Sequence, residues 1–376
     1  MYILDSTEPP HYRISRIARE LESKGIDIIH MEIGDPELDV DRRIIDAMYR
    51  AALEGYTHYG YSKGIPGLRR SIANYLNDKL GLDLDEDNIC LTPGGKVAIY
   101  LALRLLNKRR IGILEPIWGL YYSFSKVLNL DIINVRTEFE DGWLPKDDAL
   151  KRFEDVDLIS IVNPSNPTGT ILSIDTQDKI VEIAMDNDIY ILADEIYFDL
   201  IYRDIKFKSF LEYGYENTLS IFSFSKNYAM TGFRVGFVVS TNKELIDRFS
   251  KYMRLVIGGV PPFIQFAALE ALKNRDIVDN NRRFYREQTR YLSGELKKLG
   301  FDMVEPSAGI YIFPKVPNGI DGVKFTEKLL TIGRVAVSPG TGFGDYPEFI
   351  RFTTALKRDK LATAIERIRY TLENMD

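Results

Sequence analysis

Cysteine and histidine are almost missing from this chain of 376 residues, which has one cysteine, Cys90, and three histidines. A single cysteine excludes an intramolecular disulfide and a metal cluster held by cysteines, and it fits a reducing, cytoplasmic setting. The histidines are His11, His30 and His58, and no two of them have the spacing of a zinc-binding pair. We therefore do not expect zinc chemistry.

Long apolar runs and an excess of basic charge are also missing. The longest apolar stretches, such as Asp157–Val162, have the length of a buried strand and fall short of the roughly 18 residues that span a bilayer. The formal net charge of −6 offers no basic surface for nucleic acid or an anionic membrane. The first residues, MYILDSTEPPHYRIS, lack the charged and apolar segments of a secretory signal. We expect small-molecule partners, with no nucleic acid and no membrane.

Short apolar runs alternate with helical periods from about residue 90 onward. This alternation predicts an α/β fold with a largely parallel sheet and helices on both faces. Ligands of such sheets bind beyond the carboxyl ends of the strands, so we expect the chemistry in the loops that follow the runs. The runs are Ile111–Leu114, Ile132–Val135, Leu158–Val162, Tyr190–Ala193, Leu219–Phe222 and Val235–Val239.

The two ends of the chain have a different pattern. The length exceeds what a single hydrophobic core usually supports, so more than one domain is expected. A helix is predicted over Ile14–Lys24, and a long helical segment over Ile277–Leu299 begins a mixed tail. We predict that the N-terminal helix and this tail form a second, smaller α+β domain. The predicted elements of the tail are strands near Gly309–Phe313 and Phe349–Thr353 and a helix near Asp359–Glu373.

Four motifs follow predicted strands: TPGGK (Thr92–Lys96), NPSNPTG (Asn163–Gly169), ADEIY (Ala193–Tyr197) and SFSKNYAMTGFRVGF (Ser223–Phe237). Taken singly, each is explained by a turn, a loop, a solvated acidic turn or a surface lysine. Together they supply what a phosphorylated, protonated pyridine aldehyde needs. These parts are an amine, an acid for the ring nitrogen, donors for the phenolate oxygen, and N–H groups, hydroxyls and an arginine for the phosphate.

With these motifs in this order, the chain resembles the fold type I enzymes that use pyridoxal 5′-phosphate (PLP), and among them the class I and II aminotransferases. The resemblance runs from about Ile14 to Ile368, and its motifs are most similar to those of bacterial and archaeal aspartate aminotransferases. It implies a mostly parallel seven-stranded sheet sandwiched by helices, plus a smaller α+β domain. The implied large, PLP-binding domain is residues 35–278, and the small domain is residues 1–34 with 279–376.

The resemblance implies roles for the residues that match its motifs. Lys226 matches the lysine that holds PLP as a Schiff base and moves the substrate Cα proton. Asp194 matches the partner of the ring nitrogen, and Asn166 and Tyr197 match the donors to the ring oxygen. The phosphate would be bound by a set at the other end of the cofactor: Gly94, Gly95, Lys96, Ser223, Ser225 and Arg234.

Further matches concern the substrate and a second subunit. Trp118 matches the aromatic residue that stacks on the pyridine ring; taken alone, it would be read as an aromatic residue of the core. Arg351 matches the arginine that binds the substrate α-carboxylate with two hydrogen bonds; taken alone, it would be read as a salt-bridged arginine at a strand end. Gly34 matches a residue whose backbone contacts the same carboxylate. Tyr59 matches a tyrosine that reaches the phosphate of the neighbouring subunit, which implies a homodimer; Tyr61 competes for this role.

The side-chain specificity rests on Lys96, which some aspartate aminotransferases of bacterial type use to pair with the distal carboxylate. We expect aspartate or glutamate as amino donor and a 2-oxo acid as acceptor, in a ping-pong transfer through Lys226. Alternatively the Lys96 side chain is solvated, and the substrates are aromatic or other amino acids. His11, Tyr12 and Arg13 also compete for a place near the substrate.

Other functions share most of these residues. A PLP-dependent lyase or decarboxylase would use the same cofactor-binding residues. A protein that has lost its catalytic activity would not be expected to keep the lysine, the acid, the donors to the ring oxygen and the carboxylate-binding arginine together. A PLP sensor fused to a DNA-binding module is disfavoured because the chain shows no additional N-terminal recognition domain and its charge is acidic.

Overall fold

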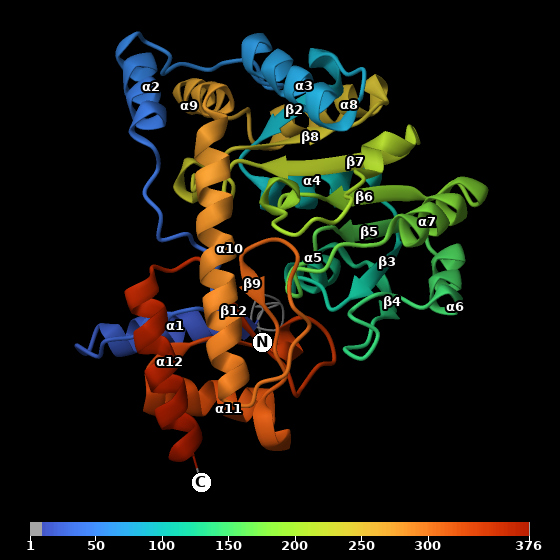
Figure 1. Cartoon of the computed structure of the whole chain (residues 1–376). Helices are drawn as coiled ribbons and strands as arrows, with labels where there is room; N and C mark the ends of the chain where they lie inside the picture. Colours follow the sequence, from blue (N-terminus) through green and yellow to red (C-terminus); the bar gives the residue numbers. More distant parts are fainter. Residues whose placement is uncertain (1–9, 376) are drawn as a thin grey trace.

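The computed structural model describes residues 10–375, apart from the side chain of His11. Its centre is a seven-stranded sheet in the order β2-β8-β7-β6-β5-β3-β4 (Figure 1). Strands β4, β3, β5, β6 and β7 are parallel, whereas β8 is antiparallel to both β7 and β2. The bounds are β2 Ile89–Thr92, β3 Arg110–Glu115, β4 Asp131–Arg136, β5 Leu158–Val162, β6 Tyr190–Asp194, β7 Thr218–Ser223 and β8 Gly236–Val239.

The six apolar runs are therefore confirmed as strands β3 to β8, and the mostly parallel sheet that the resemblance implies is present. These runs do not include β2, although a strand is expected before TPGGK, because its four residues overlap the first residue of that motif and give too short a signal. Every residue of β5 and β7 is buried, as expected for strands covered on both faces. The covering helices are α4 Gly95–Leu106, α5 Leu120–Leu128, α7 Ile174–Asp186 and α8 Lys243–Val256.

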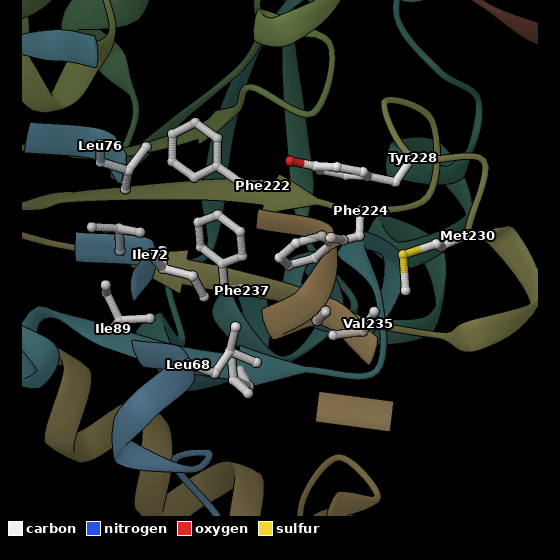
Figure 2. Close-up of a cluster of buried hydrophobic side chains, with 14 of the residues drawn as sticks. Leu68, Ile72, Leu76, Ile89, Phe222, Phe224, Tyr228, Met230, Val235 and Phe237 are labelled. Atoms are coloured by element: carbon white, nitrogen blue, oxygen red, sulfur yellow. The ribbon is translucent and has the colours of Figure 1, made fainter. Parts of the chain in front are cut away.

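One edge of the sheet packs against helix α3 (Pro66–Leu80), which ends at Gly81 in the left-handed conformation. Figure 2 shows the side chains of α3 facing those of β2, β7 and β8 and the loop after β7. The rings of Phe222 and Phe237 stack there with centroids 5.3 Å apart. Phe224 and Tyr228, on either side of Lys226, belong to the same buried cluster, so this core fixes the loop that carries the lysine.

A smaller α+β part lies below the sheet in Figure 1 and combines the two ends of the chain. Strand β1 (Ile29–His30) pairs in parallel with β10 (Val335–Ala336), and β12 (Ile350–Thr353) lies between β11 (Ser338–Pro339) and β9 (Tyr311–Ile312). Helix α1 begins at Pro10 and packs against β10 and β11, whereas its membership of one domain with the tail stays a prediction. The helices of this smaller part are α1 Pro10–Glu22, α10 Arg275–Lys298, α11 Gly322–Lys328 and α12 Arg358–Glu373.

Helix α10 runs from beside the sheet down through the smaller part, so it belongs to both regions (Figure 1). The predicted domain boundary near residue 278 falls inside this helix and stays a prediction. Within residues 10–375 no helix is long and apolar enough to cross a membrane. The remaining helices are α2 Arg42–Leu53, α6 Asp147–Leu150 and α9 Pro262–Lys273.

Candidate functional site

A cavity of about 490 Å³ opens at the carboxyl ends of the central strands, next to the smaller part. This is where ligands of open α/β sheets bind. Residues from distant motifs meet there because parallel strands end at the same edge of the sheet. The predicted residues that line it are Gly34, Gly95, Lys96, Trp118, Asn166, Asp194, Tyr197, Ser223, Ser225, Lys226, Arg234 and Arg351.

Lys226 stands in the loop after β7, and its Nζ donates a hydrogen bond to the carbonyl of Gly34. Burial lowers the pKa of the Lys226 ammonium, because the charged form loses its hydration. A depressed pKa increases the share of neutral amine, the form that attacks an aldehyde. The backbone of Gly34 lies so close to Tyr311 that a Cβ at position 34 would collide with the tyrosine hydroxyl.

Asp194 ends β6 as a fully buried carboxylate that has no cationic partner among the described residues. A backbone contact of 3.4 Å from the Ile196 N–H reaches its Oδ1, and burial raises the pKa of Asp194 to about 7. Tyr121 on α5 is also fully buried, and its hydroxyl lacks a hydrogen-bond partner within the described part. Burial and the charge of Asp194 raise the pKa of Tyr121. A buried carboxylate of this kind needs a cation beside it.

The opposite end of the cavity is suited to an anion. Gly94 precedes α4 with φ of +81°, and a Cβ there would come within 2.7 Å of Nη2 of Arg234. Arg234 donates to the carbonyls of Thr231 at 2.8 Å and Pro93 at 3.4 Å, and the hydroxyls of Ser223 and Ser225 are 3.0 Å apart. A guanidinium, two hydroxyls and the N–H groups at a helix start make an anion-binding site.

Arg351 on β12 is 2 % exposed and held on several sides. Its Nη1 donates to Oδ1 of Asn166 at 2.9 Å, and its Nη2 donates to the carbonyl of Glu32 at 2.6 Å. The guanidinium lies 4.1 Å from the ring centroid of Tyr311 and 4.7 Å from that of Phe343. Its Nε lacks a partner in the described structure. A buried guanidinium with a donor to spare suits a carboxylate ligand.

These features together fit PLP. Asp194 lacks a cation that a protonated ring nitrogen would supply, and Gly94 leaves the space that a Cβ would fill beside Arg234. Lys226 has a depressed pKa, and Trp118 lines the cavity with an aromatic ring. The amine, acid, anion site and ring thus lie in one cavity.

Lys96 directs its side chain into the cavity rather than into solvent. Its Nζ hydrogen-bonds to the hydroxyl of Tyr12 at 2.5 Å. The same Nζ lies 5.0 Å from the ring centroid of Tyr12 and 5.8 Å from that of Trp118. Tyr12 lines the cavity, whereas Arg13 does not, and the side chain of His11 lies outside the described residues.

Tyr59 is not brought into the cavity by this chain. Its side chain is fully exposed, at 103 %, and Tyr61 is 67 % exposed. A role for either in the site requires a second subunit. Conversely, sequence reasoning missed Tyr121, Tyr311 and Phe343. The position of Tyr121, three residues after Trp118, was a usable signal, because it places both near the start of the same helix.

Comparisons with known proteins agree with this geometry. The family model described as aminotransferase class I and II matches residues 26–368. An aspartate aminotransferase of Pyrococcus horikoshii is 36 % identical over 94 % of this chain and 93 % of its own length. A (5-formylfuran-3-yl)methyl phosphate transaminase of Methanocaldococcus jannaschii is 33 % identical over 95 % and 94 %. The structure of a Thermus thermophilus aspartate aminotransferase with maleate superposes with a TM-score of 0.91, at 27 % identity over 98 % of each chain.

Proposed function

The chain belongs to the class I and II aminotransferases, which depend on PLP, and we propose that it prefers acidic L-amino acids, aspartate or glutamate, as amino donors. The acceptor would be a dicarboxylic 2-oxo acid in a ping-pong transfer. The observation that carries this proposal is the Lys96 ammonium held at the cavity by Tyr12. Curated relatives named aspartate aminotransferase support it. The (5-formylfuran-3-yl)methyl phosphate transaminase of M. jannaschii shows that substrates differ among relatives at this level of identity.

The roles of the residues follow from their positions. PLP, when bound, accepts the electron pair released as the substrate Cα loses its proton. Lys226 Nζ would take up and return that proton. Asp194 would hold the proton on the ring nitrogen, because the buried carboxylate is stabilised by the positive charge. Tyr197 and Asn166 would donate to the ring oxygen, and the Trp118 ring would lie against the pyridine.

Binding at the two ends would orient the reacting bond. The N–H groups of Gly95 and Lys96 at the start of α4, with Gly94, Ser223, Ser225 and Arg234, would hold the phosphate. Arg351, fixed by its hydrogen bonds and two aromatic rings, would bind the α-carboxylate, with the backbone of Gly34 beside it. Holding the substrate in this orientation lowers the activation barrier of the proton transfer, because the reacting groups are already aligned.

The distal carboxylate of an acidic substrate would meet Lys96. Its ammonium lies near the rings of Tyr12 and Trp118, which reduce its contact with water and so strengthen its attraction for an anion. Tyr12 adds a hydroxyl at the same place. Two donors against one carboxylate would favour aspartate and glutamate over apolar amino acids.

We also infer a homodimer in which Tyr59 reaches the phosphate of the neighbouring subunit. Large apolar side chains are exposed on one region, where α2 packs on α9 and residues Tyr61–Ser62 approach Gly259. A monomer rarely leaves so much apolar surface in water. Its exposed members are Tyr49, Leu53, Tyr56, Tyr59, Tyr61, Leu255, Val256 and Ile257. The cytoplasmic setting stays a prediction.

The absorption spectrum of the purified protein tests the function. With PLP bound to Lys226, aspartate should convert the cofactor band to that of the amine form, and 2-oxoglutarate should restore it. Lys96→Ala should raise KM for aspartate at least about tenfold while changing KM for an apolar amino acid little. Equal effects on both substrates would contradict the role of Lys96. Release of oxo acid over many turnovers without any amino acceptor would indicate a lyase, and release of CO2 from the amino acid would indicate a decarboxylase.

A further inference from the structure

We propose that Tyr285 and Thr289, one turn apart on α10, are positioning residues that connect the peptide of Lys226 to the segment that carries Arg351. The inference rests on the proposed roles of Lys226 and Arg351. It concerns two residues that do not line the cavity. They would act through the groups they hold.

Tyr285 reaches the lysine directly. Its side chain is fully buried, and its hydroxyl donates to the carbonyl of Lys226 at 3.0 Å. Burial raises the pKa of Tyr285, so the hydroxyl keeps its proton and remains a donor at working pH. One turn earlier on α10, Asn281 donates from Nδ2 to the carbonyl of Asn227 at 3.0 Å. Helix α10 therefore holds two consecutive carbonyls of the loop that carries the lysine.

The same loop is also held by an ion pair between a fully buried carboxylate and a partly exposed guanidinium. Asp199, just after β6, accepts from Nδ2 of Asn227 at 2.9 Å and from Nη2 of Arg275 at 3.1 Å. Arg275, the first residue of α10, also donates to the hydroxyl of Tyr228 at 3.2 Å. Residues 226–228 are thus fixed between α10 and the loop after β6. A small displacement of α10 would move the peptide of Lys226.

Thr289 provides the second contact. It lies four residues after Tyr285 and thus on the same face of the helix. Its Oγ1 is 2.8 Å from Oγ1 of Thr354, and both side chains are buried. Thr354 follows β12 directly, three residues beyond Arg351. Arg358 reinforces this junction, because its Nε donates to Oε1 of Gln288 at 2.8 Å.

These contacts form a path from Arg351 to Lys226 that follows the backbone to Thr354, crosses to α10 by one hydrogen bond, runs along one helical turn and ends with the hydrogen bond of Tyr285. An α-helix is stiff along its axis, and the helix runs between the two regions in Figure 1. When a substrate carboxylate binds to Arg351, a displacement of the segment with Thr354 would shift α10 and, through Tyr285, align Lys226.

The test is a double-mutant cycle in the full-length holoenzyme, with Tyr285→Phe, Thr289→Val and the double variant. Tyr215→Phe is the matched control, since the Tyr215 hydroxyl also donates to backbone carbonyls, of Ala184 and Ile189, but far from the cavity. Each protein is measured for kcat, KM, melting temperature, and the Kd of PLP by absorbance titration of the apoprotein. The pH titration of the bound cofactor band is recorded as well.

We expect Tyr285→Phe to lower kcat about tenfold, to raise the Kd of PLP about fivefold and to shift the pH titration, with KM changed less than about twofold. Its melting temperature should fall no more than that of Tyr215→Phe. Thr289→Val should have a smaller effect of the same kind. The double variant should be no worse than Tyr285→Phe, because both changes interrupt one path.

Two outcomes would overturn the inference. In the first, Tyr285→Phe changes kcat, the Kd of PLP and the pH titration no more than Tyr215→Phe. In the second, the effects of Tyr285→Phe and Thr289→Val multiply in the double variant. If Tyr285→Phe does not fold, Asn281→Ala replaces it in the cycle with the same criteria. A wild-type protein that binds PLP without transaminating would refute the proposed function, whereas the Kd and the titration would still test the inference.

Discussion

Nη1 of Arg351 donates to Oδ1 of Asn166 at 2.9 Å, across 185 positions of sequence. Asn166 belongs to the loop after β5 of the large sheet, and Arg351 belongs to β12 of the smaller part. The bond therefore joins the two regions inside the cavity. It also places the expected α-carboxylate site next to the expected donor to the ring oxygen, so that substrate and cofactor would be bound by adjacent groups.

Replacing Arg351 with Lys should raise KM for the amino acid and for the 2-oxo acid about 100-fold each. An ammonium cannot donate to Asn166, to Glu32 and to a carboxylate in the plane that the guanidinium provides. Steady-state kinetics on both half-reactions checks this expectation. The Kd of PLP serves as the control and should stay within about twofold, since Arg351 is not expected to touch the cofactor. A loss of PLP affinity equal to the loss of substrate affinity would contradict this role.

The apoprotein should lose stability as the pH rises from about 4 to about 7. Asp194 ionises near pH 4 in the unfolded chain, whereas burial raises its pKa to about 7 in the folded protein. Between these values the folded state keeps a proton that the unfolded state has lost, so the free energy of unfolding decreases as the pH rises. The total decrease is on the order of a few kcal/mol. Urea unfolding of the apoprotein at pH 5 and pH 8 measures the change.

Asp194→Asn should weaken that pH dependence, because the amide does not ionise. Part of the dependence should remain, since burial also raises the pKa of Glu195 to about 7. Saturation of the wild-type protein with PLP should have a similar effect, because a protonated ring nitrogen beside Asp194 lowers its pKa again. A variant that keeps the full wild-type difference between pH 5 and pH 8 would show that Asp194 is not the group responsible.

Mixed dimers test the contribution of Tyr59 to the neighbouring site. Lys226→Ala should be inactive, and Tyr59→Ala should bind PLP weakly. When the two variants are unfolded together and refolded, half of the dimers should be hybrids with one intact site, which restores about a quarter of wild-type activity. Tyr61→Ala in place of Tyr59→Ala is the control. Restoration with Tyr61→Ala alone would assign the role to that residue, and an absence of restoration with both would mean that neither crosses the interface.

Much of the fold and of the candidate site could be predicted from the sequence, because the patterns that indicate them are formed by residues close together in the chain. The strand runs and the helix α12 were identified from periodicity, since neighbouring side chains decide which face is apolar. The motifs around Asn166, Asp194 and Lys226 follow strands that end at one edge of a parallel sheet. Their meeting in one cavity was therefore predictable once the sheet was. The short strand β2 and the early start of α1 were not, because two or three residues decide them.

Tertiary structure alone decided how these residues are supported. Tyr311, Phe343 and Tyr285 are aromatic residues in a chain that has 20 phenylalanines and 22 tyrosines, and nothing in their immediate sequence distinguishes them from ordinary core residues. The rings of Tyr311 and Phe343 contact Arg351 from other segments of the smaller part, and Tyr285 on α10 contacts the carbonyl of Lys226 after β7, so these contacts exist only after the chain has folded. The sequence by itself determined the chemical groups of the site and their order. Packing determined their distances and pKa values, because both depend on which distant segments exclude water from the cavity.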